Sequence, residues 1–178
     1  MIVFNVAGVL QEAPGATREV ALRDRYLSVG ADVELAGPID GQLRLQRTNR
    51  GILLRGSVDA LVRRTCSRCL DPFVETVSLQ LAEEFLPTVD PQRGVPLAPP
   101  APDEEALTID PQHQIDLTSV LHDELVLAEP MHPLCRPDCR GLCPGCGRHM
   151  DVGSCDCSTD EPDPRLAALA RLLDGTRD

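Results

Sequence analysis

The sequence predicts an α+β protein with an antiparallel β-meander or small open barrel, one packed helix, a cysteine-rich module and a short terminal helix. Three observations support this class. Apolar and polar residues alternate through much of the first 90 positions, which is typical of half-buried strands. One stretch with helical spacing follows residue 116, and six of the eight cysteines lie between residues 135 and 157.

The chain divides into three parts of different composition. Residues 1–90 form the β region, and residues 91–106 form a Pro-rich, acidic loop. Residues 107–178 carry the helix, the cysteine-rich module and the terminal helix. A chain of 178 residues holds one or two small domains, and we expect the first and third parts to pack as one compact unit.

The β region begins with residues 2–10, whose β-branched and apolar residues predict a strand. Residues 17–28 fit either a strand or an irregular segment. Alternation resumes over residues 33–45, with an interruption at the Gly-Pro pair 37–38. Residues 49–51, Asn-Arg-Gly, then predict a hairpin turn, because Asn and Gly tolerate positive φ.

The clearest strand follows this turn. One of its faces carries alternate apolar residues, namely Ile52, Leu54, Val58, Ala60 and Val62. A second alternating strand covers residues 73–85. Because Cys66 and Cys69 lie between these two strands, we expect them at the tip of a long hairpin.

The third part begins with a short predicted strand at residues 107–109. Asp116 is the expected N-cap of a helix, in which apolar residues follow at helical spacing until Pro130 stops it. Asp163-Pro164 opens a second helical pattern that ends at Gly175.

Charge is distributed unevenly along the chain. The net charge is −11, and all 17 basic residues are arginine. Seven of them, against the single acid Asp59, lie between residues 41 and 69: Arg44, Arg47, Arg50, Arg55, Arg63, Arg64 and Arg68. The planar fork of arginine suits phosphate, so we expect an RNA-facing patch. The alternative is a solvated β-face whose charges pair with acids elsewhere.

Several functional classes are excluded by the sequence pattern. No run is apolar enough to span a membrane, and the first ten residues lack the basic region of a signal peptide. We therefore expect a cytoplasmic protein with reduced thiols rather than a disulfide framework. The chain has no Gly-rich phosphate loop and no Ser-His-Asp context, so we expect no catalytic residues and no small-molecule substrate.

The eight cysteines form four pairs, the number that two tetrahedral, all-cysteine zinc sites need. The most local assignment places one structural zinc ion on the C-terminal thiols, Cys143, Cys146, Cys155 and Cys157. A second ion would join the upstream pair to the next two cysteines, which are Cys66, Cys69, Cys135 and Cys139. The alternative is a single C-terminal site with some thiols idle. We therefore expect a zinc-knuckle module with one or two ions.

Other interpretations of these residues stay open. Cys66-Ser-Arg-Cys69 matches the C-x-x-C pattern of redox enzymes, which place the first cysteine at a helix N-terminus. A β-patterned segment follows here instead. A further interpretation is that these two cysteines are structural residues that bind no metal. His149 could replace one cysteine as a metal ligand.

Five segments occur in a recognisable order: Gly51-Ile-Leu-Leu-Arg-Gly-Ser-Val58, Cys66-Ser-Arg-Cys-Leu-Asp-Pro-Phe73, Glu83-Glu-Phe85, Ile115-Asp-Leu117 and Cys139-Arg-Gly-Leu-Cys-Pro-Gly-Cys-Gly147, the last with Leu134-Cys135 before it. Together they resemble the bacterial YceD family, whose members are described as large ribosomal RNA subunit accumulation proteins. The resemblance spans roughly residues 30–157. It implies a non-enzymatic cytoplasmic factor with a role in ribosome biogenesis.

The leading hypothesis is therefore a ribosome biogenesis factor that supports accumulation or maturation of large-subunit ribosomal RNA. It would bind the precursor RNA or a ribosomal protein, without catalysis. Two alternatives come from other classes. One is a zinc- or thiol-based redox switch. The other is an acidic chaperone for a basic ribosomal protein, with no RNA contact.

Overall fold

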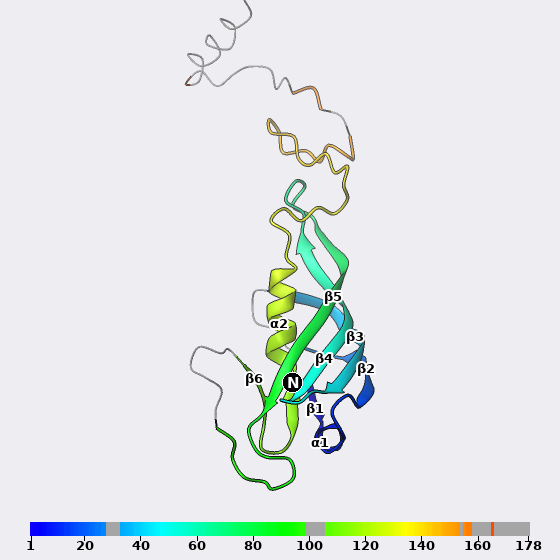
Figure 1. The fold of residues 1–178 in the computed structure, drawn as a ribbon. Helices are drawn as coiled ribbons and strands as arrows, with labels where there is room; N and C mark the ends of the chain where they lie inside the picture. The colour runs from blue at the N-terminus through cyan, green and yellow to red at the C-terminus, as the bar shows by residue number, and fades with distance from the viewer. Residues whose placement is uncertain (28–32, 99–105, 154, 158–164, 166–178) are drawn as a thin grey trace, which may run out of the picture.

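A computed structural model of the chain describes residues 1–27, 33–98, 106–153, 155–157 and 165 (Figure 1). Its described part contains a five-stranded sheet, a two-stranded sheet and two helices. The predicted helix over residues 163–175 lies outside the described residues except for Arg165, and so does the acidic stretch 99–105 of the predicted loop.

The five-stranded sheet has the order β2-β3-β4-β5-β6. Its strands are β2 (Thr17–Arg25), β3 (Glu34–Arg47), β4 (Ile52–Thr65), β5 (Pro72–Pro87) and β6 (Leu107–Ile109). The first four form an antiparallel meander, as predicted, and β6 pairs with β5 in parallel. The sheet is open rather than closed into a barrel, because its two edge strands, β2 and β6, do not pair.

The smaller sheet joins the N-terminal segment to the segment that precedes α2. It pairs β1 (Val3–Asn5) with β7 (Gln114–Asp116) in antiparallel register. Helix α1 (Ala7–Leu10) follows β1, and α2 (Thr118–Leu127) follows β7. In Figure 1, α2 lies along β5, and the cysteine-rich segment continues beyond the tip of the β4–β5 hairpin.

Three local expectations need correction. The predicted strand over residues 2–10 ends at Asn5, because the Asn5 Oδ1 atom accepts the backbone N–H of Ala7 at 3.1 Å and the chain turns into α1. The interruption at residues 37–38 is a register shift within the continuous strand β3. Asp116 accepts the N–H of Thr118 at 2.8 Å, but the helix N-cap is Leu117.

The core lies on one face of the five-stranded sheet and is almost entirely aliphatic. Strand β4 is buried at alternate positions, as its sequence pattern predicts. Helix α2 covers this face with the buried side chains Val120, Leu121 and Leu125, and Phe85 is the largest fully buried side chain. We call the opposite surface of the sheet the outer face. Neither of the two described helices has the length and apolar character of a membrane span.

Gly56 gives a test of how closely β3 and β4 approach. A Cβ atom at this position would lie 2.1 Å from the carbonyl oxygen of Gln42, a backbone atom that cannot rotate away. We expect Gly56→Ala to lower the free energy of unfolding by about 1–3 kcal/mol, the usual cost of overpacking. Gly153→Ala is the control, because a Cβ there meets nothing within 4 Å. Equal urea midpoints for the two variants would contradict the close approach.

Candidate metal centres

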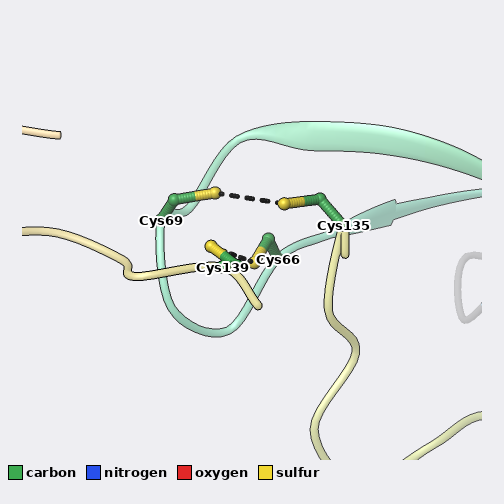
Figure 2. A group of neighbouring side chains, drawn as sticks. All are labelled: Cys66, Cys69, Cys135 and Cys139. Carbon is green, nitrogen blue, oxygen red and sulfur yellow. Dashed lines mark hydrogen bonds between the residues drawn. The ribbon is translucent and has the colours of Figure 1, made fainter. Parts of the chain in front are cut away.

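Four thiols meet at the tip of the β4–β5 hairpin (Figure 2), and we call them the hairpin set: Cys66, Cys69, Cys135 and Cys139. The first two lie in the turn between the strands, and the other two come from the segment after α2. All four sulfur atoms lie within 4.8 Å of one another. The Sγ atoms of Cys66 and Cys139 are 3.8 Å apart, and those of Cys69 and Cys135 are 3.7 Å apart.

These separations fit a metal site and not a disulfide. A tetrahedron of sulfurs, each about 2.3 Å from a central zinc ion, has edges of about 3.8 Å. A disulfide needs a separation of about 2.05 Å. All eight cysteines are free thiols in the structure. The hairpin set therefore has the spacing of four ligands around one cation.

The second group, the C-terminal set, consists of Cys143, Cys146, Cys155 and Cys157. Its sulfur atoms also lie within 4.8 Å of one another, and those of Cys143 and Cys155 are 3.2 Å apart. Cys143 is buried, whereas Cys146 and Cys157 are exposed. The two sets match the most local assignment of the cysteine pairs from the sequence.

The turns that present these thiols share one backbone geometry. In the hairpin turn, the N–H of Cys66 bonds the carbonyl of Asp71, and the N–H of Leu70 bonds the carbonyl of Cys66. The C-terminal turn repeats the pattern: the N–H of Cys143 bonds Arg148, and the N–H of Gly147 bonds Cys143. Leu70 and Gly147 hold the same left-handed conformation, with φ of 63° and 69°. Each turn thus directs both of its sulfurs to one side.

Backbone donors stabilise negative charge on the first sulfur of each turn. Hydrogen bonds from the backbone of Cys135 and then Cys69 lower the pKa of Cys66 to about 6. The backbone of Cys146, the thiol of Cys155 and the backbone of Gly145 lower the pKa of Cys143 to about 6. Both turns therefore favour a thiolate, the form that binds metal.

Two other thiols, one in each set, resist ionisation: those of Cys69 and Cys157. The backbone N–H of Asp71 lowers the pKa of Cys69, but burial and the neighbouring thiols outweigh it and raise the value to about 12. The thiols of Cys146 and then Cys143 likewise raise the pKa of Cys157 to about 12. Four sulfurs at these distances cannot all carry charge unless a cation lies between them.

Direct contacts attach the cysteine-rich segment to the hairpin. The Arg68 Nη1 atom donates to the carbonyl of Cys139 at 2.8 Å, and the N–H of Leu142 donates to the carbonyl of Arg68. His149 Nε2 lies 3.1 Å from an Asp71 carboxylate oxygen. His149 thus borders the hairpin set, where Cys69, Asp71 and His149 form a third potential ligand group.

The seven arginines do not form one surface. Arg44, Arg55 and Arg63 are exposed on the outer face, and Arg50 is exposed in the β3–β4 turn. Arg47 is half-buried and donates to the carbonyls of Leu10 and Gly51, while Arg68 bonds the cysteine-rich segment. RNA contact by the exposed members remains a prediction.

Arg64 has a structural environment that the sequence interpretation missed. Its side chain is only 4% exposed, and it pairs with Glu75 at 2.6 Å and Glu129 at 2.9 Å. Its Nη2 atom also donates to the carbonyl of Ala128. Arg64 therefore joins β4 and β5 to the end of α2. The signal was present in the sequence, because Arg64 continues the inward alternation that runs through Val62.

Arg63 and Arg64 offer a matched pair of neighbouring substitutions. We expect Arg64→Gln to lower the free energy of unfolding by about 2 kcal/mol, below the full cost of breaking a buried pair because both glutamates are half exposed. Arg63→Gln should change it by less than about 0.5 kcal/mol, since its pair with Glu34 is exposed. Urea denaturation measures both values. A larger loss for Arg63→Gln than for Arg64→Gln would contradict the assignment.

Comparison with known proteins finds relatives of undefined activity. The chain is 33% identical over 135 residues to the uncharacterized protein Rv2926c of Mycobacterium tuberculosis (strain ATCC 25618 / H37Rv), covering 76% of this chain and 62% of that protein. It has the same identity and coverage with the uncharacterized protein Mb2951c of Mycobacterium bovis. It is 29% identical over 178 residues to the uncharacterized protein ML1660 of Mycobacterium leprae, covering 97% of this chain and 77% of that protein.

The chain thus spans 62% of the length of the first of these relatives. No solved structure matches it. The family described as "Large ribosomal RNA subunit accumulation protein YceD" matches residues 54–173, a range that includes both cysteine sets and all but the first two residues of the β4–β5 hairpin. The match covers well over half of the chain, and the chain belongs to the YceD family.

Proposed function

We propose that this protein is a non-enzymatic ribosome biogenesis factor that binds precursor large-subunit RNA. The family name implies a role in accumulation of large-subunit ribosomal RNA, which supports the biological setting and a cytoplasmic location. The observation that carries the proposal is the attachment of the β4–β5 hairpin to the segment after α2. This attachment fixes the tip of the hairpin, and the register of β3 and β4 holds the exposed arginines of these strands on one face.

Zinc is the metal that this proposal assigns to both cysteine sets. Four thiolates fill a tetrahedral zinc ion completely, so such a site has no open position for substrate or water. Its role is to hold distant segments together. In the hairpin set the bridged residues are 66 and 73 positions apart in the sequence, so one ion would close large loops.

A second candidate function is an acidic chaperone for a basic ribosomal protein. It is favoured by a hollow of about 350 Å³ beside α2 and β6. Three carboxylates line this hollow, those of Glu83, Asp123 and Glu124. Leu107 and Val120 form its apolar wall. Such a site suits a basic side chain with an apolar stem. This candidate needs no RNA contact, so direct RNA-binding measurements separate it from the first.

Metal content tests the zinc assignment. We expect two zinc ions per chain in the purified protein, measured by atomic absorption after gel filtration. Cys139→Ser should leave one ion, because it removes a buried ligand of the hairpin set only. Ser67→Ala is the control and should retain two, since the backbone N–H of Ser67 still bonds Pro133. One ion in the wild type, unaffected by Cys139→Ser, would support the single-site alternative instead.

Cellular RNA levels test the biological role. Depletion of the protein should lower the ratio of large-subunit to small-subunit ribosomal RNA, measured by quantitative gel electrophoresis. Wild type and Ser67→Ala should restore the ratio, whereas Cys139→Ser should not, because the hairpin set would lose a ligand and with it the metal that joins the hairpin to the segment after α2. An unchanged ratio after depletion would refute the proposed function. Full rescue by Cys139→Ser would show that the metal-held hairpin is dispensable.

A further inference from the structure

Two arginines stand directly opposite each other on the outer face. The register of β3 and β4 pairs Arg44 with Arg55, so their side chains project from neighbouring strands on the same side. Like charges in this position repel each other and destabilise the strand pair. A cross-strand arginine pair therefore needs a compensating group.

The described residues compensate only one of the two charges. The Arg44 Nη2 atom lies 3.0 Å from a carboxylate oxygen of Glu19, and both side chains are largely exposed. Within the described part of the chain, the side chain of Arg55 has neither an ion pair nor a hydrogen bond. The two guanidinium groups and one carboxylate leave this cluster with excess positive charge.

The pair borders a hollow in the outer face. The hollow has a volume of about 540 Å³, and its polar lining residues are Glu19, Gln42, Arg44, Gln46 and Arg55. The two glutamines supply amide donors on either side of Arg44, at positions that share its face of β3. Donors of these types converge where phosphate oxygens bind in proteins.

We propose that Arg44 and Arg55 bind phosphate groups of an RNA backbone at this hollow. The inference rests on the proposed function and makes it specific, because it reduces seven candidate arginines to one cross-strand pair. Within the described residues, no aromatic side chain lines the hollow, so bases have no platform for stacking there. Recognition is therefore of the backbone, independent of base sequence and strongly dependent on salt.

The rest of the outer face limits the extent of this contact. Four register positions further along, toward the hairpin tip, Asp40 stands opposite Asp59, and Arg23 lines the same hollow as these two acids. Beyond that point Arg63 pairs with Glu34 at 2.8 Å. The Arg44–Arg55 end of the face thus attracts a polyanion more strongly than the middle, where two acids accompany Arg23.

Binding of a short synthetic RNA duplex to the full chain tests the proposal, with a second duplex of unrelated sequence as comparison. Fluorescence anisotropy would follow the wild type and the variants R44Q/R55Q, R93Q and E19Q over a range of salt concentrations. R93Q removes the same kind of charge from an exposed loop beyond β5. E19Q removes the carboxylate that competes with phosphate for Arg44.

We expect R44Q/R55Q to bind both duplexes about tenfold more weakly, with a salt slope shallower by about one for each lost phosphate contact. R93Q should bind like the wild type, and E19Q should bind more tightly. Thermal unfolding of R44Q/R55Q should occur at the same temperature as in the wild type or higher, because the substitution removes a repulsion.

The outcomes that overturn the proposal differ from those that overturn the proposed function. If the wild type binds RNA and R44Q/R55Q binds equally well, the arginine pair is not the site, while RNA binding stands. If R93Q loses as much affinity as R44Q/R55Q, the contact is general charge attraction and the site is wrong. If the zinc-loaded wild type binds no RNA at any salt concentration, the RNA-binding form of the proposed function fails as well.

Discussion

The structure depends on the meeting of sulfur atoms from two parts of the chain that are far apart in sequence. The β4–β5 hairpin extends past the end of the core, and α2 does not cover its tip. A small satellite core of Cys66, Cys69 and Cys139, with Phe73 and Leu134 packed against it, lies at that tip. So small an apolar cluster supplies little stability by itself. The thiol contacts of the hairpin set, the ion pairs of the buried Arg64 and the hydrogen bonds of Arg68 provide the further attachment that this projection needs.

The two cysteine sets differ in how they relate to the rest of the fold. Three thiols of the hairpin set are buried, and their chain segments contact β4, β5 and the stretch after α2. The C-terminal set is built from residues within a short interval of sequence and leaves two of its thiols exposed. The first set therefore joins the β4–β5 hairpin to the segment after α2. The second set organises a local segment that contacts the hairpin through Leu142 and His149.

Much of the fold could be predicted from the sequence because its β-strands alternate regularly. The inward positions of β4 and the place of Cys66 and Cys69 at a hairpin tip follow from a period of two. The grouping of the eight thiols matches the more local of the two assignments that the sequence left open. The short helix α1 could not be predicted, since Ala7–Leu10 is apolar throughout and only the Asn5 side chain turns the chain there. The parallel pairing of β6 with β5 could not be predicted from the sequence either, because it depends on a long connection and not on a local pattern.

The arginines show the main limit of interpretation from the sequence. Charge density between residues 41 and 69 suggested one basic surface, but density does not reveal which side chains face outward or which acids lie nearby. Arg64 illustrates this, because its partners Glu75 and Glu129 are 11 and 65 positions away in the sequence. Only the three-dimensional register separates Arg44 and Arg55, which face solvent across a strand pair, from arginines that hold the protein together.

The sequence separation within the hairpin set also bears on how the chain assembles as it is made. Synthesis proceeds from the N-terminus, so Cys66 and Cys69 leave the translating ribosome long before Cys135 and Cys139 exist. The meander can pair its strands during that interval, but its projecting tip has only two of the four thiols of the hairpin set. The C-terminal set needs no such wait, because Cys143 and Cys155 are only 12 residues apart. The hairpin set can therefore assemble only late in biosynthesis. A truncated product that ends before residue 135 lacks two of the set's four thiols.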